Sequence, residues 1–423
     1  MGRLSRRKFG QLMGGGAATA VIGVPFVARA ANPKVVVIGG GAGGGTAARY
    51  IAKDSKGAID VTLVEPSKTY YTCFFSNLYL GGYRDYASIG HTYENMAAQG
   101  VGVVHDWAED IDRDNKVVVL ASGARVPYDR LVVSPGIDIK YDSVPGYSVE
   151  ASAKMPHAWK SGTQVQVLKA MVENMKEGGT FVMVAPPNPY RCPPGPYERI
   201  SMIAHLLKQK NPKAKIIVLD PKEKFSKQAL FEEGWATHYD AMIEWLPASI
   251  TGGVKRVDAT EMTIQTEDET IKVDAATIVP AQMAGRIAQK AGLTNEAGWC
   301  PIVPETMQSR VDENIHVLGD ASVASAMPKS AFSANSQAKV AAMAVRGALI
   351  GARMFPPRFA NTCWSLIATD DGVKVGAAYK AGADKIEPTN TFISKTGEDA
   401  AMRSQTYQES IGWYDGITTD IFG

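Results

Sequence analysis

Four cysteines in 423 residues are few, and none of them lies in a C-x-x-C pair. The sequence therefore lacks zinc-finger spacing and also the C-x-x-C-H motif that attaches haem covalently. It lacks a charge excess too, since 45 Lys and Arg stand against 43 Asp and Glu. Without a basic surplus to neutralise a phosphate backbone, nucleic acid is not an expected partner, and no metal site is predicted.

The first thirty residues resemble an export signal rather than part of the fold. Arg6 and Arg7 are followed by a weakly apolar, Gly/Ala-rich run to Val27 and the small-residue pattern 28–30. This order resembles a twin-arginine signal removed near Ala30, which predicts a periplasmic protein. The run is too short and too mild for stable membrane insertion. A membrane anchor or a cytosolic basic arm is the alternative.

A glycine-rich turn follows the first strand predicted after this signal. The turn has the G-x-G-x-x-G register of a dinucleotide fingerprint, formed by Gly39, Gly41 and Gly44. A β-branched run, 34–38, precedes it, a helical stretch, 46–54, follows, and the next strand ends at Glu65. Such a unit places a pyrophosphate at a helix N-terminus and an acid at a ribose hydroxyl.

Two later segments indicate that the dinucleotide is FAD. The strand 130–133 runs into Gly136, and the strand 315–318 ends at Asp320. Together with the fingerprint they resemble the FAD signatures of the disulfide-reductase-like flavoproteins. In that family the acid at the position of Asp320 binds the flavin ribityl chain, although it could instead cap a helix.

The order of these elements predicts an α/β fold of the glutathione-reductase type. We expect two Rossmann-like dinucleotide-binding domains and a small α+β C-terminal domain. The FAD-binding domain should comprise residues 32–146 and 280–350. The second Rossmann-like domain should span 147–279, and the C-terminal cap 351–423.

The second Rossmann-like unit has the expected elements but a different loop. A strand, 180–184, a helix, 198–210, and a strand, 216–219, are predicted, yet the first loop, 185–196, is rich in proline. Proline has no N–H to offer a phosphate, so NAD(P)H should not bind in the usual way. Cys192 lies in this loop near a helix N-terminus, which would favour its thiolate. A stiff surface loop is the alternative.

Several unusual motifs carry a closer resemblance over essentially the whole chain after the signal. They are YYTCFFSN (70–77), RCPPGPYE (191–198), WCP (299–301), NTCWSLI (361–367) and GWYDGITTDIFG (412–423). On these motifs the sequence resembles the flavoprotein subunit of flavocytochrome c sulfide dehydrogenase.

The resemblance implies a role for three of the four cysteines. It implies that Cys73 forms a thioether to the 8α-methyl of FAD, and that Cys192 and Cys363 form a redox disulfide beside the flavin ring. A free buried thiol at Cys73 and a purely structural disulfide are the alternatives. Cys300 is assigned to packing.

Two further residues are candidates by the same resemblance. Glu198 matches an acid near the disulfide and could accept or relay the substrate proton, or it could only favour the helix N-terminus. Trp413 matches an aromatic residue that lines the cavity, or it is a core tryptophan.

The implied activity is that of a sulfide:cytochrome c oxidoreductase. Hydrosulfide attacks the disulfide and leaves a persulfide, and the electrons pass through FAD to a c-type cytochrome subunit that carries the haem. A sulfide:quinone oxidoreductase is the alternative enzyme, although the tail 380–423 lacks the sustained apolar face that membrane docking requires. A flavin or persulfide carrier without turnover of its own is a third possibility.

Overall fold

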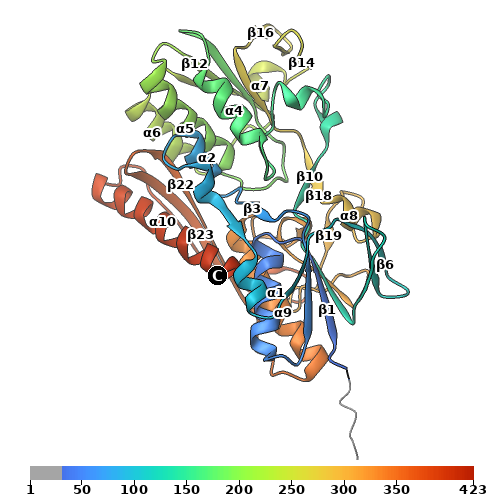
Figure 1. Cartoon of the computed structure of the whole chain (residues 1–423). Coiled ribbons are helices and arrows are strands. Elements are labelled where there is room, and N and C mark those ends of the chain that lie inside the picture. Colours follow the sequence, from blue (N-terminus) through green and yellow to red (C-terminus); the bar gives the residue numbers. More distant parts are fainter. Residues whose placement is uncertain (1–30) are drawn as a thin grey trace, which may run out of the picture. The chain divides into compact units, whose positions relative to one another are not determined.

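The computed structural model describes residues 31–423, so the predicted signal lies outside the described residues. Residues 33–423 form one compact unit, whose larger sheets are two parallel sheets and a C-terminal antiparallel sheet (Figure 1). This arrangement confirms the predicted α/β class with a separate C-terminal sheet. In the described part of the chain, no helix has the length and apolar character needed to cross a membrane.

The first parallel sheet has the strand order β20-β9-β1-β2-β5. Its strands are β1 (Lys34–Ile38), β2 (Asp60–Val64), β5 (Gly102–Val104), β9 (Arg130–Val133) and β20 (Ile315–Val317). Valine-rich β1 is almost wholly buried, because it pairs on one side with β2 and on the other with β9. Two helices, α1 (Ala42–Ser55) and α9 (Ala331–Ile350), pack on each other beside this sheet.

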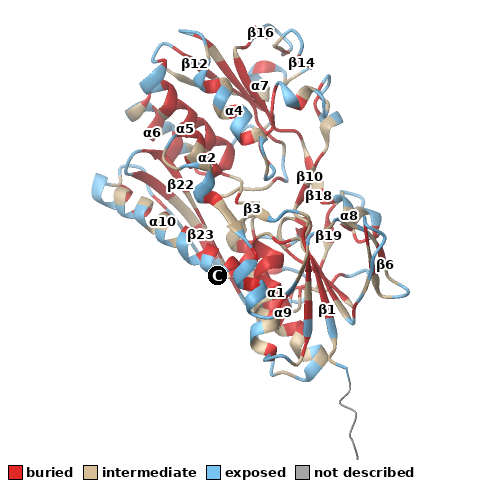
Figure 2. Cartoon of the chain, viewed as in Figure 1, coloured by how far each residue is buried: buried red, intermediate tan, exposed pale blue. Residues whose placement is uncertain are grey.

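The second parallel sheet has the order β13-β12-β11-β17. It consists of β11 (Thr180–Val184), β12 (Lys215–Asp220), β13 (Ile243–Pro247) and β17 (Ala275–Ile278), with helices α4 (Gln164–Glu173), α5 (Gly195–Lys210), α6 (Gln228–His238) and α7 (Ala248–Thr251). The predicted strand 180–184 has the bounds of β11, whereas α5 begins three residues before the predicted helix. Figure 2 shows the strands of both parallel sheets buried, as expected for sheets covered on both faces.

The C-terminal sheet is antiparallel and consists of β22 (Arg358–Ala368), β23 (Asp371–Ala381) and β24 (Ile386–Ile393). The long helix α10 (Ala400–Phe422) packs on β22 and β23, and α5 packs on β22. We predicted that the tail has no sustained apolar face, but α10 buries Ile417, Ile421 and Phe422. These residues join the core beside α1, so the apolar side of the tail faces the protein interior.

Short elements complete the described chain. Small strand sets are β3 (Thr69–Tyr71) with β4 (Gly90–Thr92); β6 (Ala108–Asp112), β7 (Val117–Leu120) and β8 (Arg125–Pro127); β10 (Ile137–Ile139) with β18 (Gln282–Ala284); β14 (Arg256–Asp258), β15 (Thr263–Gln265) and β16 (Thr270–Lys272); and β19 (Cys300–Pro301) with β21 (Ser322–Val323). Short helices are α2 (Ser76–Leu80), α3 (Glu94–Ala98) and α8 (Arg286–Lys290). The β10–β18 pair lies near both predicted boundaries of the second domain, which remain predictions.

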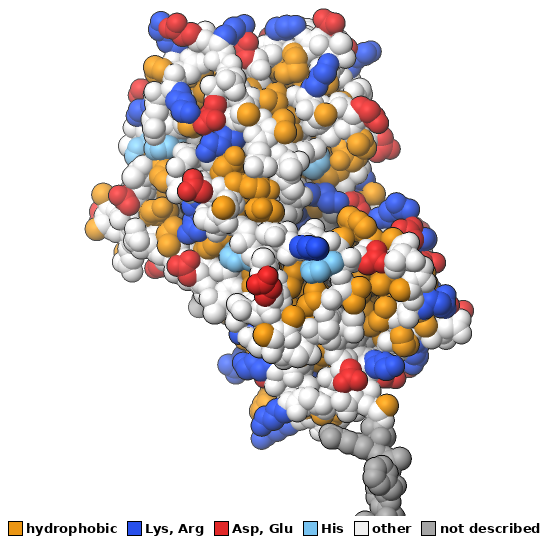
Figure 3. Space-filling model, in the orientation of Figure 1, with side chains coloured by type: hydrophobic (Ala, Val, Ile, Leu, Met, Phe, Trp, Pro, Cys, Tyr) orange, Lys and Arg blue, Asp and Glu red, His pale blue; other side chains and the backbone are white. Residues whose placement is uncertain are grey.

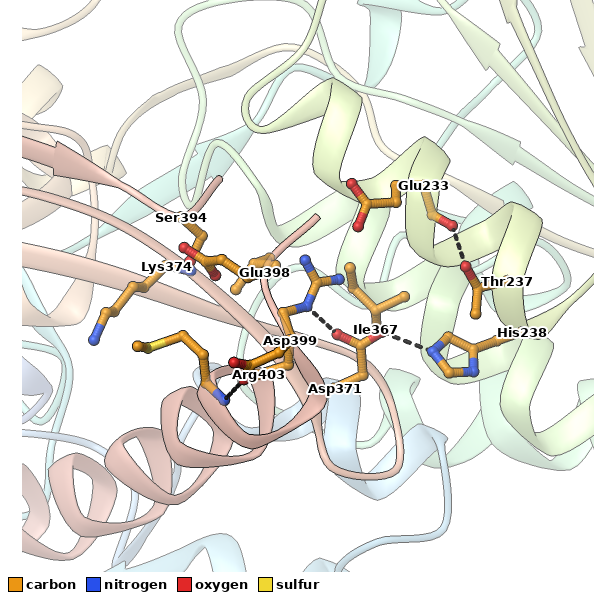
Figure 4. A network of polar contacts seen from close by, with 12 residues as sticks. Glu233, Thr237, His238, Ile367, Asp371, Lys374, Ser394, Glu398, Asp399 and Arg403 are labelled. Carbon is orange, nitrogen blue, oxygen red and sulfur yellow. Dashed lines mark hydrogen bonds and ion pairs between the residues drawn. The ribbon is translucent and has the colours of Figure 1, made fainter. Parts of the chain in front are cut away.

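A buried polar network ties α10 to α6 across the C-terminal sheet (Figure 4). Asp371, at the start of β23, accepts hydrogen bonds from Arg403 of α10 and pairs with His238 of α6 at 2.7 Å. A buried carboxylate needs such partners, because an unpaired charge in the interior is costly. The network therefore fixes how the last helix lies against the rest of the fold.

Candidate active site

The glycine fingerprint forms a tight turn between β1 and α1. Gly39 has φ of 95°, and a Cβ there would lie 2.3 Å from the carbonyl oxygen of Ser134. A Cβ at Gly44 would lie 1.8 Å from the carbonyl oxygen of Gly39. Only glycine fits either position, so the helix N-terminus is open to a close approach by a pyrophosphate.

The acid predicted at the end of β2 lies beside this turn. Glu65 accepts a hydrogen bond from the backbone N–H of Gly40 at 2.8 Å and one from that of Ser67 at 3.0 Å. Both oxygens are thus oriented by the backbone. Glu65 also lines the cavity described next, where an acid is placed to bind a ribose hydroxyl.

A cavity of about 950 Å³ brings together the predicted site residues from distant parts of the chain. Of the predicted cofactor-binding residues, its lining includes Gly39, Gly41, Glu65, Cys73, Gly136 and Asp320; of the predicted catalytic residues, it includes Cys192, Glu198, Cys363 and Trp413. Gly44 does not line the cavity but makes the turn at its edge possible. The volume is at the upper end of the range typical of small-molecule and cofactor sites.

Asp320 provides a direct test of whether the cavity fits a flavin. Its Oδ2 pairs with Nε of Arg191 at 2.6 Å, whereas its Oδ1 is buried and has no hydrogen-bond partner in the protein. A buried acceptor without a partner is unfavourable unless a ligand supplies the donor. A ribityl hydroxyl would supply it. Together with the glycine turn, this free oxygen fits FAD.

Cys73 lies in the loop before α2 and faces the same arginine. Nη1 of Arg191 donates to the Sγ of Cys73 at 3.4 Å and to the carbonyl oxygen of Trp159 at 3.1 Å. Arg191 thus links the flavin-signature acid Asp320 to the cysteine predicted to carry the flavin.

Cys192 lies in the proline-rich loop immediately before α5. Its φ is 58°, its N–H donates to the carbonyl oxygen of Lys329 at 2.7 Å, and its own carbonyl oxygen accepts from the N–H of Gly195 at 2.8 Å. A Cβ at Gly195 would lie 2.9 Å from the Cys192 sulfur. The absence of a side chain at Gly195 therefore makes room for the cysteine side chain.

The prediction that the helix N-terminus favours a Cys192 thiolate is wrong for this structure. Burial raises the pKa of the Cys192 thiol, and the neighbouring Cys363 and Glu198 raise it further, while Lys227 lowers it. Desolvation outweighs a helix dipole, because the dipole contributes at most about 2 kcal/mol. Cys192 is therefore held mainly as a neutral thiol in this state.

Cys363 lies in β22, far along the chain from the loop that carries Cys192. Its Sγ accepts a hydrogen bond from Nδ2 of Asn361 at 3.3 Å. Burial raises the pKa of Cys363, and the Asn361 amide and Lys227 oppose that rise. All four cysteines are free thiols in the structure, so the predicted Cys192–Cys363 disulfide is not formed in it. The two thiols nevertheless line one cavity, and Cys363 raises the pKa of Cys192.

Glu198 lies at the start of α5, close to both cysteines. Its Oε2 accepts from Nδ2 of Asn77 at 2.8 Å, and its Oε1 accepts from the N–H of Leu366 at 3.0 Å. Burial raises the pKa of Glu198, whereas these hydrogen bonds lower it. The carboxyl group thus bridges α2, α5 and β22 and can hold or release a proton near the cysteines.

Trp413 belongs to a group of aromatic rings on the cavity wall. Its ring lies 5.3 Å from that of Trp364, 5.8 Å from that of Phe74 and 6.1 Å from that of Phe332, measured between centroids. All four rings line the cavity. Trp413 also packs against the hydrophobic core, so both readings of this residue from the sequence describe part of its surroundings.

Cys300 differs from the other cysteines in its surroundings. It is fully buried in β19, does not line the cavity, and has Lys329 as its nearby charged group. Burial raises its pKa to about 12. The described residues contain no cluster of His, Cys, Asp and Glu suited to a metal ion.

In the second Rossmann-like unit, the acid at the end of the second strand is already bound by other side chains of the protein. Asp220, at the end of β12, accepts from the hydroxyl of Tyr197 at 2.6 Å and from Nε1 of Trp245 at 3.0 Å, and pairs with Lys222 at 2.6 Å. In a nucleotide-binding unit this position would be free to bind a ribose. The polar contacts of Asp220 and the prolines of the preceding loop both argue against a second dinucleotide here.

Sequence reasoning missed three polar residues of this site, namely Asn77, Arg191 and Lys227. Asn77 and Arg191 fall within quoted motifs, but nothing in their spacing reveals their partners. Lys227 lies outside every motif that we recognised. Its contacts with β22 span 136 residues or more of sequence and become visible only in the fold.

Three family models match separate parts of the chain. The central part of the sulfide dehydrogenase [flavocytochrome c] flavoprotein chain matches residues 165–280, and the flavin-binding part of flavocytochrome c sulphide dehydrogenase matches residues 355–422. The pyridine nucleotide-disulphide oxidoreductase model matches residues 33–179.

The chain is also similar to sulfide:quinone oxidoreductases. It is 24% identical over 295 residues to the mitochondrial enzyme of Mus musculus and 22% identical over 303 residues to that of Dictyostelium discoideum. Each match covers 68% of this chain and 65% of the relative, so the chain spans less than two thirds of either relative. The solved sulfide:quinone oxidoreductase of the hyperthermophilic bacterium Aquifex aeolicus has a TM-score of 0.70 and 16% identity, with 92% of this chain and 91% of that chain covered.

The similarity to the solved structure, at 16% identity, shows a shared fold and nothing more. The family models are more specific, because two of them describe different parts of one kind of protein and match this chain in the corresponding order. The chain therefore belongs to the family of flavocytochrome c sulfide dehydrogenase flavoprotein chains, which are FAD-binding flavoproteins.

Proposed function

We propose that this protein is the flavoprotein subunit of a sulfide dehydrogenase that oxidises hydrosulfide at Cys192 and Cys363. One observation carries the proposal: two cysteines 171 residues apart line the same cavity as the residues that fit FAD. A partly buried acid, Glu198, lies close enough to both cysteines to influence their ionisation. This set combines a dithiol, a proton acceptor and a seat for an electron acceptor.

The cycle begins from the oxidised cysteine pair, which differs from the thiol pair of the structure by two electrons and two protons. Hydrosulfide attacks one sulfur of the disulfide, so that one S–S bond forms, another breaks, and the second cysteine leaves as a thiolate. A second hydrosulfide attacks the outer sulfur of the persulfide. An S–S bond forms between the two sulfide-derived atoms, the bond to the cysteine sulfur breaks, and the cysteine leaves as a thiolate while hydrogen disulfide, after loss of a proton, departs as its anion. The cysteine pair is then reduced.

Bound FAD supplies a two-electron acceptor that can pass electrons on one at a time. Loss of two electrons and two protons from the cysteine pair restores the disulfide. Glu198 is placed to take one of these protons, because its carboxyl group is held near both sulfurs by Asn77 and the Leu366 N–H. The rings of Trp413 and Trp364 give this side of the cavity an apolar wall.

Covalent attachment of FAD at Cys73 and an exported location complete the proposal. Cys73 lines the cavity beside the residues that fit FAD, and Nη1 of Arg191 donates to its sulfur at 3.4 Å. A c-type cytochrome subunit would accept the electrons singly. Acidic and basic side chains are interspersed on the face in Figure 3, so docking there would depend on local pairs rather than on a field of one sign.

A quinone is the second candidate acceptor, because the curated relatives are named sulfide:quinone oxidoreductases. Anaerobic addition of sulfide should bleach the visible absorption of the flavin, and the reduced protein can then be mixed with cytochrome c or with decylubiquinone. Faster reoxidation by cytochrome c supports the proposal. Faster reoxidation by the quinone would overturn the assigned acceptor.

Cysteine variants test the reaction itself. Cys192→Ser and Cys363→Ser should each abolish bleaching by sulfide and leave the flavin in place. Cys300→Ser is the matched control, because Cys300 is buried outside the cavity, and it should bleach as the wild type does. Normal bleaching in either of the first two variants would rule out a mechanism that uses the pair.

A further inference from the structure

Lys227 is a buried lysine that the proposed reaction has not yet used. It immediately precedes α6, and 6% of its surface is exposed. Its Nζ donates to the carbonyl oxygen of Cys363 at 3.1 Å, to Oγ of Ser365 at 2.8 Å and to the carbonyl oxygen of Val373 at 3.3 Å. The ammonium group is thus fixed against the strand that carries Cys363.

These three acceptors are all uncharged, and no carboxylate in residues 31–423 lies within ion-pair distance of Nζ. The titratable groups that face Lys227 are Cys363 on β22, Cys192 in the loop before α5, Glu198 in the first turn of α5, and Arg403 on α10. Glu198 is already held by Asn77 and by the Leu366 N–H. A buried cation without a counter-ion is costly, so its presence calls for an anion.

The ionisation of the lysine reflects this imbalance. Burial lowers the pKa of Lys227 to about 8, whereas negative charge on Cys363, Glu198 or Cys192 would raise it. The largest of these favourable interactions is with Cys363. An anion on that sulfur would therefore hold the lysine in its charged form.

We propose that Lys227 is a positioning residue whose ammonium group stabilises anionic sulfur on Cys363. This inference rests on the proposed sulfide oxidation, which generates such an anion whichever sulfur is attacked. Attack at Cys192 breaks the disulfide and leaves the electron pair on Cys363 as a thiolate. Attack at Cys363 leaves a persulfide there, which loses its proton to become an anion, and Cys192 is then the leaving thiolate.

The test measures the Cys363 thiol directly and needs no sulfide. The dithiothreitol-reduced holoprotein is treated with iodoacetamide across a pH series, and alkylation of the Cys363 peptide is followed by mass spectrometry. In Lys227→Gln, which keeps hydrogen-bond donors but loses the charge, the apparent pKa of Cys363 should rise by about 1 unit or more. Lys227→Arg, which keeps the charge, should remain close to the wild type.

Two further variants separate this role from a structural one. Lys227→Met removes both the charge and the hydrogen-bond donors. If the charge is responsible, it should raise the apparent pKa of Cys363 as Lys227→Gln does. Either variant alone is sufficient if the other fails to fold. Lys222→Gln is the matched control, because Lys222 is a partly buried lysine that pairs with Asp220 and is influenced by no cysteine. An unchanged Cys363 profile in a folded Lys227 variant, or an equal shift in the control, overturns the inference.

The outcome is distinguishable from failure of the proposed function. If sulfide does not bleach the wild-type flavin, the proposed function is wrong, yet the alkylation profiles still report whether Lys227 controls Cys363. If sulfide does bleach it, Lys227→Gln should bleach at least about tenfold more slowly near neutral pH, with partial recovery as pH rises. The same rate at every pH would contradict a role in the reaction.

Discussion

Arg191 and Asp320 form a partly buried ion pair at 2.6 Å that leaves one carboxylate oxygen of Asp320 buried and without a partner in the protein. The same guanidinium contacts Cys73. One arginine thus orients the acid that fits the ribityl chain and the cysteine predicted to bond the flavin.

This pair predicts how FAD affinity depends on Asp320. In a Cys73→Ser background, where flavin can leave, Asp320→Asn should raise the Kd for FAD about tenfold or more, because a charge-assisted hydrogen bond is lost. Fluorescence titration of the apoprotein with FAD measures this change. Asp384→Asn, in an exposed pair with Arg310, is the control and should leave the Kd unaltered. Equal affinities would remove Asp320 from the binding site.

Covalent attachment makes a separate prediction about Cys73. After acid precipitation the wild-type pellet should be yellow, and the flavin should map to the peptide that contains Cys73. Cys73→Ser should release its flavin to the supernatant, whereas Cys300→Ser should not. Colour found wholly in the wild-type supernatant would refute the covalent bond.

Glu198 should impose a pH dependence on sulfide oxidation. Burial raises the pKa of Glu198, so the carboxyl group stays protonated at a higher pH than an ordinary glutamate. As pH falls through this raised pKa, the group can no longer accept a proton and the bleaching rate should fall. Glu198→Gln should be slower by about 100-fold at neutral pH and lack this acid limb.

Stopped-flow bleaching over a pH series provides the measurement. Glu232→Gln, at an exposed position of α6, should keep both the rate and its acid limb. An acid limb that persists in Glu198→Gln would assign the titration to another group.

Two buried histidines predict a loss of stability in acid. Burial lowers the pKa of His157 and of His316 to about 4, below the usual value of 6.5. Their neutral forms are favoured by folding, so this contribution is full above pH 6.5 and is lost as pH falls from 6.5 to 4. Each histidine should account for about 3 kcal/mol across that window.

Thermal unfolding followed by circular dichroism between pH 7.5 and 4 tests this prediction. His316→Gln should lose about half of the pH-dependent change in Tm. His105, for comparison, is an exposed residue, and His105→Gln should retain the wild-type slope. A wild-type Tm that is constant down to pH 4 would contradict the prediction.

The network in Figure 4 predicts the stability of the C-terminal sheet. Arg403→Met leaves Asp371 with His238 alone and should lower the free energy of unfolding by about 3 kcal/mol. Arg310→Met, which breaks the exposed pair with Asp384, should cost less than about 1 kcal/mol. Urea denaturation compares the two, and equal effects would show that the buried network is not special.

The contrast between Glu65 and Lys227 shows how far the sequence could be interpreted. Glu65 follows a strand that follows a glycine turn, and this local order predicts its position without knowledge of the rest of the fold. Lys227 contacts Cys363 across 136 residues, and no local pattern predicts such a pair. The fold class was predictable because it follows from such local order. The electrostatics of the site were not predictable, because they depend on contacts between distant parts of the chain.

The error about Cys192 has the same origin. Its place before a helix is visible in the sequence and suggests a stabilised thiolate. Its burial among Cys363, Glu198 and a hydrophobic wall is a property of tertiary structure, and desolvation is the larger effect. The sequence correctly indicated which cysteines line the cavity, but it did not indicate the protonation state of Cys192.

The cavity is completed by the end of the chain, because β22 and α10 supply Cys363 and Trp413 to its wall. During synthesis the glycine turn and Cys73 leave the ribosome hundreds of residues earlier. FAD can therefore reach the incomplete cavity before β22 and α10 pack against it. Truncation before β22 should yield a chain that takes up flavin loosely and has no sulfur chemistry.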